Sequence, residues 1–463
     1  MRPPSPFRIE LAAAARLAAP VVATQLGIML MGVIDTMMLG HLSATALAAG
    51  GLGHILTTTC MLFGYGLLSA LDPLVAQAHG AGDAKAIAGH FQRGLVLATA
   101  VTLPLMLLFL DVEPLLRAAD QPALVSRATA DYTWGILWGL LPYFLFIVLR
   151  QTLQAMSIVR QTTVAIVLGN LVNLLFNWLL IFGHLGFPAL GVEGSALSTS
   201  LARWAMFLYL LAASRHKLAE YWPGWRAFAL EARAFGKYVL MLRIGLPIAV
   251  HSAAELGIFA LGALLIGLIG VDELGGHQIA INLASLSFMV PLGIAGAATT
   301  RVGNAIGRGD LPAARRAAKA CLLLGGGTMA GFAIVFATLP GALGHLYTAD
   351  PAVIAVVIAL LPIAAVFQVF DGLQVVASGV LRGAADTTFP AAMALIGYWA
   401  IALPVGWFLA FHAGLGARGL WWGFVVGLMT VAILLLLRIA ARFRGPIARV
   451  GNASAETKGE LSR

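Results

Sequence analysis

The sequence predicts an all-α integral membrane protein with twelve transmembrane helices in two pseudo-symmetric six-helix bundles. Three observations predict it: the composition, the number of long apolar segments, and the placement of basic residues between them. Of the 463 residues, 60% are hydrophobic and 11% are charged, and the mean hydropathy is +0.91. A soluble domain is roughly 45–50% apolar and about 25% charged. No soluble core could bury this much apolar surface, so the lipid bilayer is the expected surrounding.

Twelve apolar segments are long enough to cross a bilayer, since a spanning helix needs about 20 predominantly apolar residues. They extend over 11–39, 46–78, 94–112, 128–150, 162–183, 192–213, 237–269, 275–305, 317–341, 352–380, 389–411 and 417–440. Residues 1–213 are expected to form an N-terminal six-helix lobe and 237–441 a C-terminal six-helix lobe. The polar, basic segment 214–236 is a predicted cytoplasmic linker, and 442–463 a disordered cytoplasmic tail.

Basic residues lie almost entirely on one side of the predicted membrane. Of the 29 Lys and Arg residues, three fall in outer segments (Arg117, Arg127 and Arg418), Arg203 lies within a span, and the remaining 25 lie on the inner side. Such a bias marks the cytoplasmic face. The sequence therefore predicts a multi-pass protein of the inner (cytoplasmic) membrane with both termini in the cytoplasm. The net charge of +9 is explained by topology, so no nucleic-acid partner is expected.

The two halves resemble each other at matched positions. At an offset of 227 residues RLAAP (16–20) falls on RIGLP (243–247), and VAQAHGAGD (75–83) falls on VGNAIGRGD (302–310) with five of nine positions identical. Six spans in each half start both halves on the same side of the membrane. The repeat is therefore parallel, with a cavity expected between two bundles, as in transporters.

Three carboxylates lie deep in predicted spans: Asp35, Glu255 and Asp371. Each costs about 2.5–3.5 kcal/mol at a helix centre, so intramembrane acids are functional by default. The alternative is a structural acid paired with a base, but Arg203 is the only base within a span and cannot satisfy all three. Burial raises the pKa of a carboxyl group in general, so such acids can take up a proton and release it when another cation approaches. They are predicted to bind the coupling ion and the substrate in competition.

The chain resembles NorM-like members of the multidrug and toxic compound extrusion (MATE) family over nearly its whole length, and four segments carry the resemblance. They are GVIDTMMLGHL (32–42), RIGLPIAVHSAAELGIFALG (243–262), HQIAINLASLSFMVPLGIAGAATTRVGNAIGRGD (277–310) and FDGLQVVASGVLRGAADT (370–387). The resemblance implies twelve helices in two lobes, a central cavity, and export of amphiphilic cations in exchange for protons or sodium ions. It implies no cofactor. The expected partners are small amphiphilic molecules and the bilayer, and the expected state is a monomer.

The resemblance also implies supporting residues around the acids. Asn173 and Asn177, which are spaced i, i+4 and so share a helix face, would join Thr199 near Asp35. This oxygen-rich group is a possible sodium site; no other metal site is expected. Other family-matched positions with an expected role in the cavity are the polar Gln278 and Asn282 and the aromatic Phe288 and Phe367. For the polar residues interhelical hydrogen bonds are an equal alternative, and core packing is the alternative for Phe288. Many relatives have tyrosine where this chain has Phe367, which removes an oxygen and favours protons over sodium.

Two other functions remain alternatives. A lipid-linked saccharide flippase of the same superfamily would need Arg and Lys in its cavity to hold phosphates, and the spans contain almost none. An intramembrane enzyme would need a catalytic constellation, but HExxH and GxSxG motifs are missing from the sequence. Cys60 and Cys321 have no metal-ligand spacing around them. The expectation is therefore a transporter, not an enzyme.

Overall fold

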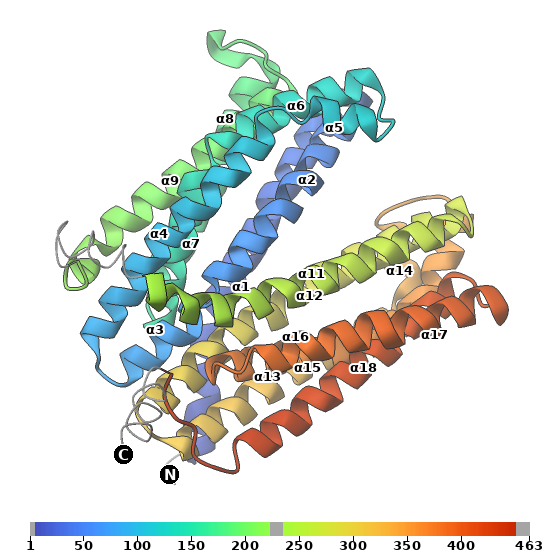
Figure 1. Cartoon of the computed structure of the whole chain (residues 1–463). Helices are drawn as coiled ribbons and strands as arrows, with labels where there is room; N and C mark the ends of the chain where they lie inside the picture. Colours follow the sequence, from blue (N-terminus) through green and yellow to red (C-terminus); the bar gives the residue numbers. More distant parts are fainter. Residues whose placement is uncertain (1–4, 223–234, 451–463) are drawn as a thin grey trace. The chain divides into compact units, whose positions relative to one another are not determined.

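The computed structural model describes residues 5–222 and 235–450, and in these residues it contains helices and no strands (Figure 1). The predicted linker falls largely on 223–234 and most of the predicted tail on 451–463, so both predictions lie mainly outside the described residues. The all-α prediction is confirmed.

The twelve predicted spans are present as eleven continuous or nearly continuous helices and one bent pair. The spans are α1 (Pro6–Leu42), α2 (Ala44–Leu68) followed by α3 (Leu71–Gly80), α4 (Ala84–Phe109), α6 (Ala123–Leu137) with α7 (Leu140–Ala155), α8 (Arg160–Phe182), α9 (Val192–Ala219), α11 (Tyr238–Gly267), α12 (Val271–Gly307), α13 (Leu311–Thr338), α15 (Pro351–Gly383), α16 (Thr388–Leu395) continued by η3 (Ile396–Ala402), α17 (Leu403–Trp407) and η4 (Phe408–His412), and α18 (Ala417–Arg442). The bent pair α6 and α7 turns by 50°. The short helices α5 (Glu113–Ala118), α14 (Pro340–His345), η1 (His184–Gly186) and η2 (Phe235–Lys237) lie between spans.

The chain divides into two compact units. One contains the start of the chain up to Val22, residues 72–81 and everything from Leu246 onward; the other contains 23–71 and 82–245. In the first unit α12, α13, α15 and α18 pack along one another, and in the second α8 packs along α9 (Figure 1). The first turns of α1 and nearly all of α3 are thus grouped with the C-terminal half, because most of their contacts are within that unit.

The repeated loop motif has the same backbone geometry in both copies. Gly82 and Gly309 have φ of 69° and 72°, a left-handed conformation that glycine adopts at no steric cost. The next residues, Asp83 and Asp310, each cap a helix by accepting a hydrogen bond from the backbone N–H three residues later, at 2.9 Å in both copies. The aspartate and glycine that the repeat preserves are therefore the residues that start the third span of each half.

The same repeat produces a reciprocal helix crossing between α3 and α12. A Cβ at Gly80 would lie 2.1 Å from the carbonyl oxygen of Asn304, and a Cβ at Gly307 would lie 2.1 Å from the carbonyl oxygen of Gln77. Gly307 and Asn304 are the residues 227 positions after Gly80 and Gln77. Each helix thus has a glycine of the repeated motif at the point where the backbone of the other helix comes close.

The crossing predicts a large difference between two glycine substitutions. Gly80→Ala puts a methyl group against a backbone oxygen. We expect the free energy of unfolding to fall by about 1–3 kcal/mol, seen as a lower melting temperature of the purified protein. Gly327→Ala is the control, because nothing lies within 4 Å of its Cβ position, and it should not lower the melting temperature. Equal melting temperatures for both variants would contradict the reciprocal crossing.

Candidate functional site

Asp35 of α1 is held by three donors from two neighbouring helices. Asn173 and Asn177, one turn apart on α8, donate from Nδ2 to Asp35 Oδ1 at 2.9 and 2.6 Å. Thr199 on α9 donates from its hydroxyl to Oδ2 at 2.7 Å. Asp35 is 7% exposed. The structure therefore brings together all four residues that the sequence analysis grouped, and it surrounds the carboxylate with hydrogen-bond donors.

The donors are also bonded to one another. Asn177 Nδ2 lies 3.3 Å from Asn173 Oδ1, and Asn173 Nδ2 lies 3.2 Å from Thr199 Oγ1. Both asparagines are fully buried. Such a connected buried network fixes the orientation of each amide, because turning one of them would leave a buried donor without an acceptor.

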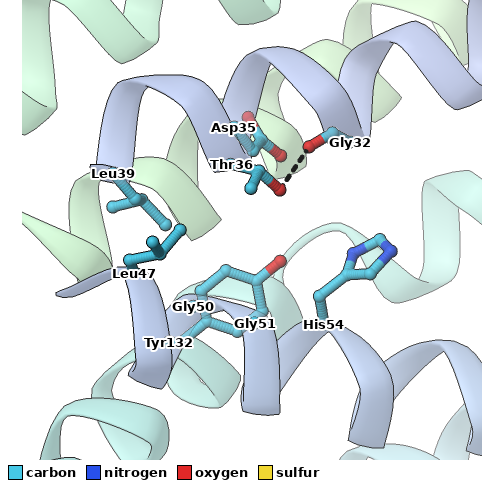
Figure 2. Close-up of a pocket in the computed structure, with 9 residues that line it drawn as sticks. All are labelled: Gly32, Asp35, Thr36, Leu39, Leu47, Gly50, Gly51, His54 and Tyr132. Atoms are coloured by element: carbon cyan, nitrogen blue, oxygen red, sulfur yellow. Dashed lines mark hydrogen bonds between the residues drawn. The ribbon is translucent and has the colours of Figure 1, made fainter. Parts of the chain in front are cut away.

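Asp35 also borders a small pocket between α1, α2 and α6 (Figure 2). His54 and the glycines Gly50 and Gly51 of α2 line the opposite wall, and Tyr132 contributes an aromatic ring from α6. His54 and Tyr132 were not predicted from the sequence, because a single polar residue on an apolar helix gives no spacing signal. The remaining lining residues are Gly32, Thr36, Leu39 and Leu47. The pocket thus brings an acid, an imidazole and an aromatic ring together around one small hollow.

Glu255 of α11 and Asp371 of α15 form a second acidic site, in the unit that contains the C-terminal half. The two carboxylates interact electrostatically with each other. Asp371 is 4% exposed, and its buried Oδ1 has no hydrogen-bond partner within the described part of the chain. The Glu255 side chain is 19% exposed, and its nearest basic nitrogen is His251 Nε2, 3.9 Å from Oε2. This site is poor in donors, in contrast to the site at Asp35.

Two further polar residues surround the second site. Gln374, less than one turn after Asp371, lies with Nε2 3.0 Å from His251 Nε2. Tyr398 is buried, interacts electrostatically with both acids, and has a hydroxyl without a partner among the described residues. It lies on the π-helical turn η3, and such turns are frequent at functional sites. The sequence analysis missed both residues. The i, i+3 spacing of Gln374 from Asp371 places both on one helix face and could have predicted Gln374 from the sequence. The π-helical turn that carries Tyr398 has no such sequence pattern.

Arg203, the only base within a predicted span, forms no ion pair with a carboxylate in the described ranges. Its guanidinium lies over the Tyr143 ring, 4.8 Å from the centroid. The three acids are thus without an arginine or lysine partner in the residues that the structure describes.

The remaining predicted residues form no hydrogen bond with the three acids in the part of the chain that the structure describes. Gln278 and Asn282 are exposed on α12, and Asn282 Oδ1 accepts a hydrogen bond from the Tyr347 hydroxyl at 2.8 Å. Phe288 is half-buried. Phe367 is 2% exposed and packs edge-to-face in an aromatic cluster, with ring centroids 5.9 Å from Phe259 and 5.5 Å from Trp421. In this structure Phe367 belongs to the core, and a cavity role for these four residues stays a prediction.

Comparison with known proteins gives consistent matches. The family model of MatE matches residues 20–179 and 247–408. The chain is 40% identical to a probable multidrug resistance protein NorM of Mesorhizobium japonicum, covering 96% of each chain, and 38% identical to the multidrug resistance protein NorM of Burkholderia vietnamiensis, covering 94% of each. Among solved structures it is similar to the eukaryotic MATE transporter AtDTX14, with a TM-score of 0.82, 24% identity and coverage of 94% and 96%. It is also similar to the Vibrio cholerae MATE transporter VcmN in the bent form, with a TM-score of 0.82, 17% identity and coverage of 95% and 98%.

The network around Asp35 predicts the effect of removing one donor. Thr199→Val keeps the side-chain shape but removes the hydroxyl, and a hydrogen bond to a charged group contributes about 1.5–3 kcal/mol. We expect a lower melting temperature, and a smaller further loss when Thr199→Val is added to Asp35→Asn, because the two groups act as a pair. Thr99→Val is the control in the same unit, since its exposed hydroxyl bonds only its own helix at Leu95. Additive effects of the two substitutions would show that the pair is not coupled.

Proposed function

The chain belongs to the MatE family, and we propose that this multi-pass membrane protein exports lipophilic, mainly cationic compounds in exchange for protons by alternating access. The observation that carries the proposal is a set of three acids in membrane-spanning helices, the buried Asp35 in one unit and the buried Asp371 with the half-buried Glu255 in the other, without an arginine or lysine partner among the described residues. The relatives named multidrug resistance proteins support the breadth of substrates.

The preference for cations rests on the sign of the sites. Asp35, Glu255 and Asp371 are acids in membrane-spanning helices without an arginine or lysine partner among the described residues, and a negative charge without a countercharge inside a bilayer is costly. A lipophilic cation brings a compensating charge, which the aromatic ring of Tyr132 beside Asp35 also attracts. An anion would bring a second negative charge to the same place.

Exchange follows from competition for the same oxygen atoms. A protonated carboxyl group is neutral and has no electrostatic attraction for a cation, whereas the carboxylate attracts one strongly in a low-dielectric surrounding. A substrate cation and a proton therefore displace each other at one acid. If each occupied form favours one orientation of the protein, the two fluxes are coupled in opposite directions.

Protons are favoured over sodium by the kind of atoms at each site. Around Asp35 the neighbours present N–H and O–H donors, whereas a hard cation such as sodium needs several oxygen ligands. Holding sodium there would require the amides of Asn173 and Asn177 to turn, which would break their mutual bonds. At the second site Phe367 has no hydroxyl and is enclosed by aromatic rings. A proton needs only one carboxylate oxygen.

The inward bias of basic residues supports an orientation with both termini in the cytoplasm, and export then runs from the cytoplasmic side outward. A monomer with two units is sufficient for the cycle, because each acidic site is built within one unit.

Neutralising the second site is predicted to stop transport. Asp371→Asn and Glu255→Gln should each reduce export of a lipophilic cation from reconstituted vesicles to the level of protein-free vesicles, because neither amide binds a proton reversibly. An anion of similar size should not be exported even by the wild type. Asp272→Asn, an exposed acid in the first turn of α12, is the matched control and should retain wild-type export. Wild-type rates in both site variants would refute the role of these acids, and anion export would refute the cation preference.

The coupling ion is tested by imposing one gradient at a time. We expect a pH gradient to drive cation export from vesicles, and a protonophore to abolish it. A sodium gradient at equal pH on both sides should drive little export, because donors and aromatic rings surround the acids. Sodium-driven export that a protonophore leaves unchanged would overturn the assignment to protons.

A further inference from the structure

We propose that His251 is a second proton-carrying residue of the Glu255–Asp371 site. Its neutral ring bonds Gln374 and its imidazolium pairs with Glu255, and binding of a substrate cation shifts the ring to the neutral form and releases the Nε2 proton to water. The inference rests on the proposed proton-coupled export and assigns to it a group that is not a carboxylate.

The hydrogen bonds of His251 identify its form in the structure. Gln374 Nε2 is an amide nitrogen that only donates, so His251 Nε2, 3.0 Å away, must accept. The ring also bonds the backbone of Pro390, which has no N–H, so the carbonyl accepts from the other ring nitrogen. These partners suit a neutral imidazole with its proton on Nδ1 and its lone pair on Nε2.

A second arrangement is available to the same ring. The Nε2 atom that accepts from Gln374 lies 3.9 Å from Glu255 Oε2, one helical turn along α11. A proton on Nε2 turns this atom into a donor, so the Gln374 amide nitrogen must move away and Glu255 becomes the acceptor. Gln374 Oε1 is buried and has no partner among the described residues, so the amide can turn to present this oxygen instead. Neutral and charged His251 thus have alternative partners already in place.

The charges around the ring favour two exchangeable states. The titratable and charged groups that act on the site are Glu255 on α11, Asp371 and Arg382 on α15, and Tyr398 on η3. A carboxylate inside a membrane favours a positive charge beside it, which the imidazolium of His251, with Nε2 3.9 Å from Glu255 Oε2, can supply without any external ion. Arg382 opposes that charge. A lipophilic cation entering the site supplies the same compensation, and its repulsion of the imidazolium expels the Nε2 proton.

The test counts the protons released when a cation binds. Tetraphenylphosphonium, which is permanently charged, is added to the purified protein in weakly buffered solution, and released protons are measured with an indicator dye and divided by the bound cation. We expect His251→Gln to release about one proton fewer per bound cation than the wild type, because its amide carries no titratable proton. His345→Gln, which removes an exposed histidine at the end of α14 in the same unit, should release the wild-type number.

A measurement on the unaltered protein keeps the test independent of folding in the variant. With isotope-labelled histidine, the imidazole nitrogen signals should show one ring that changes from charged to neutral when the cation binds, and this ring should be missing in His251→Gln or in His251→Asn. Gln374→Leu removes the donor that holds the neutral ring, and it should retain proton release while binding the cation more weakly.

The outcomes separate two failures. Equal proton release by the wild type and His251→Gln, or a His251 ring that stays neutral with and without cation, would overturn the role of His251 and leave proton-coupled export by the acids intact. Cation binding by the wild type with no proton release at all would overturn the proposed coupling itself.

Discussion

A carboxylate inside a bilayer must replace the water it has lost, and the two acidic sites meet this requirement in opposite ways. At Asp35 the replacement is built in: three donors from α8 and α9 occupy both oxygens. At Asp371 one oxygen is left without a donor in the described residues, and a second acid lies nearby. The first site is therefore a stable place for a negative charge, and the second is a place where charge must be supplied or removed.

Because the two acids differ in the number of donors around them, the two units are expected to respond differently to a change of protonation. A saturated carboxylate changes its protonation only if its network rearranges, so occupancy at Asp35 is linked to the packing of α1 against α8 and α9. In the proposed exchange, the Glu255–Asp371 pair, with few donors around it, is the site that responds to protons and substrate. A transporter with one site of each kind has both a conformational sensor and an ion-exchange site.

Much of this arrangement could be predicted from the sequence, because the bilayer imposes simple rules. Length and hydropathy predict the twelve spans, and the i, i+4 spacing of Asn173 and Asn177 predicts a shared face toward one acid. The break between α2 and α3 lies just before Pro73, and the bend between α6 and α7 lies at Gly139, just before Pro142, so proline and glycine mark both in the sequence. Tyr398 could not be placed by a 3.6-residue period, because the π-helical turn η3 changes the direction of its side chain. The core position of Phe367 could not be predicted either, because it depends on packing against Phe259 and Trp421 from two other helices.

The reciprocal crossing of α3 and α12 separates what was duplicated in this chain from what was not. Gly80, Gln77 and Asp83 have counterparts 227 residues later, so the scaffold exists twice. The acids do not: the positions that correspond to Asp35 and Glu255 at this offset are Gly262 and Ile28. A homodimer of either half alone would therefore reproduce the crossing and its capped loops, but with two copies of one kind of acidic site and none of the other. Both halves in one chain are thus needed to hold the two kinds of acidic site together.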